Sequence, residues 1–152
     1  MNILNYKKIA NEVVKNFYTK KDKFNQWQIA DYDKLTSLVM FNAHSIYRVF
    51  KDDFLIRENK DGIKTDTIKK FFDADLNEYK KAENVDIKKR YDTKSKKFYT
   101  CIDDEVWIND DTLKYLDAKQ EYQFWYKSKK EPIFITTLKD FKVALICPVH
   151  IQ

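Results

Sequence analysis

The sequence predicts an α+β fold: antiparallel sheets of hairpin-connected strands with an N-terminal helix, a central helix and a short third helix. The first observation is that segments with helical spacing of apolar residues are separated by runs of short strand-like segments bounded by polar turns. The second is a continuous apolar run at residues 143 to 149, which is typical of a buried strand. Helices placed between runs of hairpin-connected strands indicate antiparallel sheet.

Length and composition predict one domain, residues 1 to 152, with a substantial core and a densely charged surface. Hydrophobic residues make up 43% and charged residues 35% of the chain, the latter above the usual ~25%. No apolar run approaches the ~18 residues that a membrane span needs. Residues 1 to 8 lack the basic-then-apolar order of a secretory signal. We therefore expect a cytoplasmic protein that does not enter a membrane.

The first expected element is an amphipathic helix at residues 2 to 17. Apolar side chains recur there at the spacing of one helix face, and Asn2 or Asn5 is the expected N-cap. The apolar positions are Ile3, Tyr6, Ile9, Ala10, Val13, Val14 and Phe17.

Strands are expected next. The segment around Trp27 alternates between apolar and polar residues, which predicts a strand. Residues 35 to 41 and 45 to 50 are rich in apolar and β-branched side chains, and they predict a hairpin that turns at residues 42 and 43. A further short extended piece is expected at residues 52 to 56.

The central helix is expected to have Thr65 as its N-cap and to end near Ala82. A polar loop at residues 58 to 65 precedes it and holds Gly62, the only glycine of the chain. The apolar residues at helical spacing are Ile68, Phe71, Phe72, Leu76 and Tyr79.

The rest of the chain is expected to form six strands and one short helix. Val85, Ile87 and Tyr91 alternate with charged residues, so they are expected on one face of a strand that turns at residues 92 to 95. Asn109 is the expected N-cap of the short helix. The six strands are expected at residues 85 to 91, 97 to 102, 106 to 108, 122 to 126, 132 to 136 and 143 to 149.

The residue types exclude or disfavour several catalytic chemistries. One glycine cannot build the Gly-rich loop that cradles a phosphate. Cys101 and Cys147 are expected to be buried thiols, and no closely spaced Cys and His set provides a zinc site. In a regular final strand Cys147 and His150 point to opposite sides, which separates them. We therefore expect no enzyme activity, no catalytic residue, no metal and no cofactor.

Acidic residues cluster at residues 52 to 53, 103 to 105 and 110 to 111. Clustered carboxylates hold Mg²⁺ in phosphoryl-transfer sites, which leaves a small metal-dependent enzyme as an alternative. The simpler interpretation is structural. Residues 103 and 104 suit a turn, and residues 110 and 111 suit the first turn of a helix, where negative charge meets the positive end of the helix dipole.

The leading candidate for a nucleic-acid-binding surface is a basic hairpin around the turn at residues 92 to 95. Lysine and arginine contact phosphates, and aromatic side chains such as Tyr91 and Tyr99 stack on bases. The alternative is a solvated turn in a lysine-rich chain. The chain has 26 Lys and 3 Arg, which disfavours base-specific reading because guanine contacts favour Arg. The candidate binding residues are Lys88, Lys89, Arg90, Tyr91, Lys94, Lys96 and Lys97.

Trp125 is a second candidate binding residue. Alternation along its strand places Tyr122, Phe124 and Tyr126 on one face and Trp125 with Gln123 on the other. A tryptophan on a polar face is a typical anchor for a protein partner. The alternative is that a helix packs over this face and covers the ring.

The C-terminal third also shows a family pattern. It runs strand, short helix and three strands, the helix opens after Ile108 and Asn109, and Pro132 opens the penultimate strand. The chain then closes with Cys147, Pro148, Val149, His150 and Ile151 after an apolar strand. In this order of elements and in these residues it resembles the final half-domain of bacterial sliding DNA clamps.

That resemblance covers about a third of the chain and departs from the family at three positions. Cys147 stands where the family has Met, His150 where it has Arg, and Thr112 where its helix often has Tyr. The clamp tail lines a peptide-binding groove, so the resemblance implies that Cys147, Pro148 and Val149 lie beside such a groove here. A shared fold does not by itself transfer the function.

The chain is rich in Lys, Asn, Ile, Tyr and Phe, which have AT-rich codons, and poor in Gly and Arg, whose codons are mostly GC-rich. This bias indicates an AT-rich genome. Together with the absence of a catalytic set, it favours a non-enzymatic phage or mobile-element accessory factor that binds a host protein or complex. An inhibitor of a defence nuclease, of the anti-CRISPR type, is one form. The alternative is a clamp-like protein that binds DNA or RNA through the basic hairpin. The sequence leaves the oligomeric state open.

Overall fold

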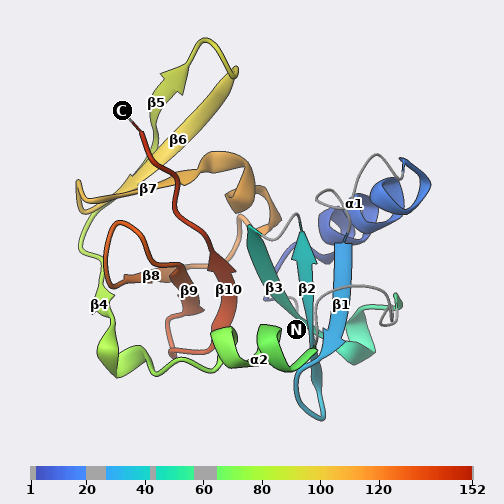
Figure 1. Cartoon of the computed structure of the whole chain (residues 1–152). Coiled ribbons are helices and arrows are strands. Elements are labelled where there is room, and N and C mark those ends of the chain that lie inside the picture. Colours follow the sequence, from blue (N-terminus) through green and yellow to red (C-terminus); the bar gives the residue numbers. More distant parts are fainter. Residues whose placement is uncertain (1–2, 20–26, 42–43, 57–64, 152) are drawn as a thin grey trace.

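The computed structural model describes residues 3–19, 27–41, 44–56 and 65–151, and it has the α+β architecture that the sequence predicts. In these segments the strands form two antiparallel sheets (Figure 1). The larger has the order β1-β2-β3-β10-β9-β8-β4, and the smaller is β5-β6-β7. The strands are β1 (Trp27–Asp31), β2 (Thr36–Phe41), β3 (Ser45–Phe50), β4 (Lys80–Lys81), β5 (Val85–Asp92), β6 (Lys97–Ile102), β7 (Val106–Asn109), β8 (Tyr122–Tyr126), β9 (Ile133–Thr137) and β10 (Lys142–Ile146).

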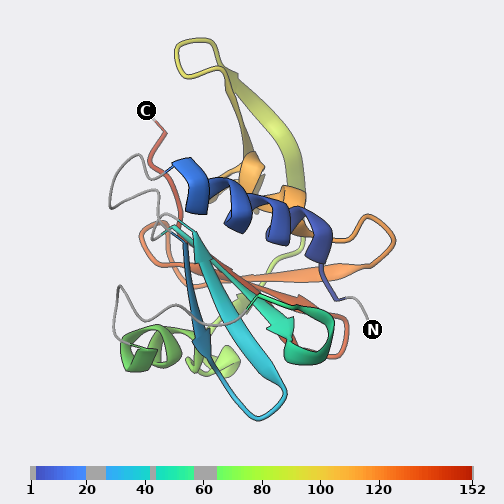
Figure 2. The ribbon, with the colours of Figure 1, turned by 90° about the vertical axis from the view of Figure 1, so that its right-hand side faces the viewer.

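Two α-helices lie on opposite faces of the larger sheet (Figure 2). Helix α1 (Tyr6–Thr19) packs with the smaller sheet and the 3₁₀ helix η4 (Asp110–Tyr115) on one face. Helix α2 (Thr65–Phe72) packs on the other face through Ile68 and Phe72. Because both faces are covered, β2 is buried at every position, which explains why its residues 38 to 41 are all apolar.

Helix α1 has a side-chain N-cap and one buried face. The Asn5 side chain accepts a hydrogen bond from the Lys8 N–H at 3.1 Å, so Asn5 is the N-cap, and Asn2 lies outside the described residues. Ile9 and Val13 are buried, whereas Val14 is 48% exposed. The buried stripe is therefore narrower than the apolar spacing predicts.

The hairpin of β2 and β3 is confirmed, and its register runs from Thr36 opposite Phe50 to Phe41 opposite Ser45. Its turn at residues 42 and 43 lies outside the described residues, as do residues 58 to 64 of the polar loop with Gly62. The extended piece expected at residues 52 to 56 is wrong for Asp52 and Asp53, which belong to the 3₁₀ helix η2 (Lys51–Asp53), whereas the buried Phe54 that follows has an extended backbone.

The central helix is shorter than predicted: α2 starts at Thr65 and ends at Phe72 rather than near Ala82. Asp75 then caps the 3₁₀ helix η3 (Leu76–Glu78) by accepting from the Asn77 N–H at 2.9 Å. Leu76 and Tyr79 still pack against the core cluster under α2, which explains why their spacing suggested one helix.

Two predicted strands differ in detail. In β5 the ladder to β6 is irregular between Asp86 and Arg90, and Lys88 has a φ of 53°. Val85 lies opposite Ile102 and Tyr91 opposite Phe98, four residues apart on β6, so these two side chains share a face as predicted. Ile87 lies in the bulge, where the alternation is interrupted.

The final strand was also predicted too long. Strand β10 ends at Ile146, not at Val149, and the residues that follow change partner. The Cys147 N–H donates to the carbonyl of His44, the residue before β3, at 2.8 Å. The Val149 N–H instead donates to the carbonyl of Trp107 in β7, also at 2.8 Å. Pro148 lies between them and has no N–H to continue a ladder.

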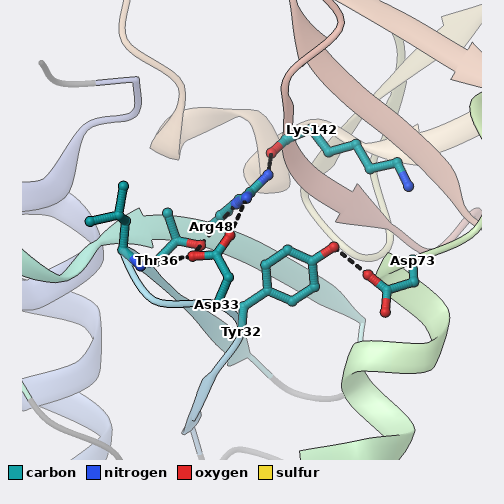
Figure 3. A network of polar contacts seen from close by, with 7 residues as sticks. Tyr32, Asp33, Thr36, Arg48, Asp73 and Lys142 are labelled. Carbon is teal, nitrogen blue, oxygen red and sulfur yellow. Dashed lines mark hydrogen bonds and ion pairs between the residues drawn. The ribbon is translucent and has the colours of Figure 1, made fainter.

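A polar network joins α2 to the sheet (Figure 3). The Arg48 guanidinium donates to Asp33 Oδ2 at 2.7 Å and to Thr36 Oγ1 at 3.1 Å, and it lies over the rings of Tyr32 and Phe141. The Tyr32 hydroxyl in turn donates to Asp73, just beyond α2.

Lys142 completes the attachment of α2. Its Nζ donates to Phe72 O at 2.8 Å and also to Ala74 O, where the helix ends. A cation at a helix C-terminus satisfies carbonyls that have no partner within the helix and opposes the negative end of the dipole. The helix stop is therefore specified by a residue seventy positions away in the sequence.

Candidate functional site

The basic hairpin is a projecting two-stranded arm. Strands β5 and β6 extend beyond the rest of the ribbon at the top of Figure 1, and Figure 2 shows the same projection from the side. Near the tip Tyr91 lies opposite Phe98, and Asp92 opposite Lys97. Asp92 orders the turn, since it accepts from the Ser95 hydroxyl at 2.8 Å and the Lys94 N–H at 3.0 Å. These bonds hold the pKa of Asp92 below its usual value.

The cations of this hairpin are not equivalent. Lys89 forms ion pairs with Asp104 and, at 3.5 Å, with Asp86, and the Asp104 hydrogen bond raises the pKa of Lys89. For Lys94, Lys96 and Lys97 no ion pair occurs with any residue that the structure describes. These three exposed lysines are therefore available to a ligand, as is Lys88, which is exposed and also forms no ion pair with a described residue.

The aromatic side chains of the hairpin lie on two faces. Tyr91 and Phe98 are half-exposed neighbours with ring centroids 4.7 Å apart, and Lys88 Nζ lies 5.5 Å from the Phe98 centroid. Tyr99 follows Phe98 in β6, so its side chain leaves the opposite face. Arg90 lies opposite Tyr99 in the ladder and shares that face.

A pocket of about 490 Å³ lies beneath the Tyr99 face; we call it the polar pocket. Distant parts of the chain build it: helix α1, the end of β2 and the start of β3, the strands β6 and β7, the helix η4, and the C-terminal tail (residues 147–151), which contributes residues 147 to 149. Its lining includes His44, Lys97, Tyr99, Asn109, Lys114 and Val149. Lys97 and Tyr99 reach it together because they are two residues apart on one strand.

A second, apolar groove runs along α2, with a volume of about 280 Å³. Phe71 stands at its side and is 60% exposed. Its lining includes Met40, Ile46, Ile68, Phe71, Leu145 and Cys147. Of the three tail residues singled out in the sequence, Cys147 borders both the apolar groove and the polar pocket, whereas Pro148 and Val149 line the polar pocket.

The cysteines do not have the environment of nucleophiles. Cys101 and Cys147 are both free thiols, and burial raises the pKa of each. Cys147 is a backbone neighbour of His44, a juxtaposition that the sequence does not indicate because it depends on the pairing of β3 with β10. A raised thiol pKa keeps the reactive thiolate scarce, which argues against cysteine catalysis here.

The acidic clusters have structural contacts. Asp103 and Asp104 form the turn between β6 and β7, with φ values of 50° and 55°. Asp103 accepts hydrogen bonds from the Asn84 N–H at 2.7 Å and the Tyr126 hydroxyl at 3.0 Å. Asn109 caps η4 through the Asp111 N–H at 3.0 Å, as predicted. Across the described segments, no group of three His, Cys, Asp or Glu side chains is placed to hold a metal ion.

Trp125 lies on the α2 side of the larger sheet. Phe124 and Tyr126 point into the core cluster on the α1 side, whereas Trp125 packs against the cluster that Phe72 and Phe134 share. The Trp125 Nε1–H donates to Thr136 Oγ1 at 2.9 Å, and the ring is half-buried. Its contacts are those of a residue at the margin of the core.

Comparison of the chain with protein-family models, with curated proteins and with solved structures found no match. Among the described residues, the structure has no helix that is long and apolar enough to cross a membrane. The surfaces of the molecule are therefore what indicates its function. The sequence identified the hairpin and the tail, but not His44 or Lys114, because no local pattern shows which distant segments will meet in a pocket.

Proposed function

We propose that this chain is a non-enzymatic binding protein whose basic hairpin binds the phosphate backbone of a nucleic acid. The observation that supports this most is the projecting arm of β5 and β6, which carries six cations against two carboxylates, Asp86 and Asp92. A two-stranded ribbon is narrow enough to enter the major groove of DNA. Lysines at its surface neutralise phosphates and release counterions.

The hairpin favours backbone binding over base-specific binding. Arg90 is the only arginine of the hairpin, and its other cations are lysines, which act on phosphates as point charges. Phosphate contacts position a protein but carry no sequence information directly. We therefore expect affinity that varies little with sequence and falls steeply with salt.

The test is an equilibrium titration of a fluorescent oligonucleotide with the wild type and two variants. The first variant reverses three hairpin charges outside the polar pocket, Lys88→Glu, Lys94→Glu and Lys96→Glu. The second makes the same change in net charge elsewhere, at the exposed residues Lys34, Lys119 and Lys139. The proposal expects a large loss of affinity in the first variant and a small one in the second. Equal losses would refute the hairpin as the site.

A second candidate function is supported by the apolar groove. An exposed Phe71 beside a groove lined by Met40, Ile68 and Leu145 fits a short apolar segment of a protein partner. The resemblance to sliding clamps implies a groove of this kind next to Cys147. In this case the protein is a cytoplasmic phage or mobile-element factor that occupies a host protein, with an anti-CRISPR-type inhibitor as one form.

The groove candidate has its own matched test. Phe71→Glu places a charge in the groove, and Leu55→Glu places the same charge at an apolar residue that is 84% exposed and outside the groove. Partner capture that is lost with Phe71→Glu, kept with Leu55→Glu and kept in the hairpin variant supports the groove. Capture that survives Phe71→Glu contradicts it.

A further inference from the structure

We propose that the polar pocket binds one unpaired nucleotide of the strand that the hairpin holds, so that the protein selects single-stranded over fully paired nucleic acid. This inference rests on the proposed function of the hairpin and adds a substrate class to it. It is carried by the position of the pocket: Lys97 and Tyr99 belong to the hairpin strand β6 and also line the pocket. A strand that contacts Lys97 and Tyr99 on the arm therefore also contacts the wall of the pocket.

The pocket has the size and the partly aromatic lining of a small-ligand site. Its volume of about 490 Å³ is within the range of ~300 to 1,000 Å³ that is usual for such sites. Tyr99 is half-exposed at the β6 wall, and Phe41 and Tyr115 are buried beneath, with their rings stacked at 5.3 Å between centroids. An accessible ring beside a polar cavity offers a base one stacking surface.

The polar groups suit the two parts of a nucleotide. Lys97 and Lys114 are exposed cations at the pocket and are placed to receive the phosphate, and Arg90 leaves the same face of the hairpin as Tyr99. Asn109 uses its side-chain oxygen to cap η4, which leaves its amide N–H groups as donors to a base. The Asp111 carboxylate also lines the pocket and accepts hydrogen bonds only.

The charged residues at the polar pocket favour one orientation of a bound nucleotide. The carboxylates of Glu12 and Asp111 line the pocket and repel a phosphate from them, while accepting hydrogen bonds from the exocyclic amines of a base. The base therefore enters and the phosphate stays with the lysines and the hairpin. A base within a duplex can enter only after it leaves its stack and its partner, which costs free energy that an unpaired base does not pay.

The experiment compares a single-stranded oligonucleotide that carries 2-aminopurine with its duplex. Tyr99→Ala is expected to weaken single-strand binding by about 5- to 150-fold, the range for loss of one base–aromatic stack, and to leave duplex binding within about twofold. Tyr99→Phe keeps the ring and should bind as the wild type does. Phe98→Ala is the matched control, since this neighbouring ring is outside the pocket and already contacts Tyr91. Thermal unfolding of every variant checks that it is folded.

The outcomes separate this inference from the proposed function. Loss of single-strand affinity in Tyr99→Ala, with a 2-aminopurine signal on binding that the variant lacks, supports the pocket. If the wild type binds both forms equally and Tyr99→Ala changes neither, the pocket assignment is overturned, while the hairpin charge variant still decides the proposed function. If Phe98→Ala loses as much single-strand affinity as Tyr99→Ala, the stacking site is the hairpin itself and the pocket is again overturned.

Discussion

Lys142→Met tests how the structure holds α2 on the sheet. In the wild type Lys142 Nζ donates to Phe72 O and Ala74 O at the end of α2, and it lies 4.6 Å from the centroid of the Phe134 ring. Methionine keeps most of the stem and removes both donors. Hydrogen bonds from a charged group contribute about 1.5 to 3 kcal/mol each. Removing the ammonium also relieves its burial cost, and water can reach part of the site, so we expect a net loss of about 1 to 2 kcal/mol.

Urea unfolding and thermal unfolding measure this loss directly. For a domain of this size, 1 to 2 kcal/mol lowers Tm by roughly 2 to 8 °C. Amide exchange in α2 should accelerate more than exchange in β2, because the attachment is local. Lys139→Met is the control, since Lys139 is exposed and its side chain forms no hydrogen bond or ion pair with the described residues. Stability of Lys142→Met within about 0.5 kcal/mol of the control would refute this account of the helix stop.

The remaining predictions concern titration and thiol chemistry. Burial raises the pKa of Tyr47, Tyr115 and Tyr32, the last to about 12. Above about pH 10 the unfolded chain therefore loses protons that the folded chain keeps, so the free energy of unfolding should fall as pH rises. A free energy of unfolding that stays flat from about pH 9 to 11 in urea unfolding would contradict this. Cys147 should react with a thiol reagent faster than Cys101, because Cys147 is only partly buried. It should react more slowly than a free cysteine, because burial raises its pKa. Equal rates for Cys147 and Cys101 would contradict the burial assignment.

Local patterns predicted much of the fold. Strand β6 occurs at the residues expected from alternation, and Asn109 caps the short helix as its residue type and position suggest. The hairpins are also local, since each depends on two neighbouring segments and a turn. The basic hairpin was visible in the sequence for the same reason: its cations lie close together in the chain.

Features that depend on distant residues were not predicted. Leu76 and Tyr79 continue the helical spacing of α2, but Lys142 specifies where the helix ends. The predicted length of the last strand was wrong because its partner changes from β3 to β7 after Cys147. The polar pocket combines segments from both ends of the chain, and no sequence period indicates which of them meet.

The most direct test of the central claim is the salt dependence of nucleic-acid binding by the wild type and the hairpin variant Lys88→Glu, Lys94→Glu and Lys96→Glu. Each phosphate contact contributes about 0.9 to the slope of log K against log salt for duplex DNA and about 0.7 for a single strand. If these three lysines contact phosphates, the slope should become shallower by about 2 to 3 in the variant and stay unchanged in the Lys34, Lys119 and Lys139 control. An unchanged slope in the hairpin variant, or no binding by the wild type at physiological salt, would contradict the account.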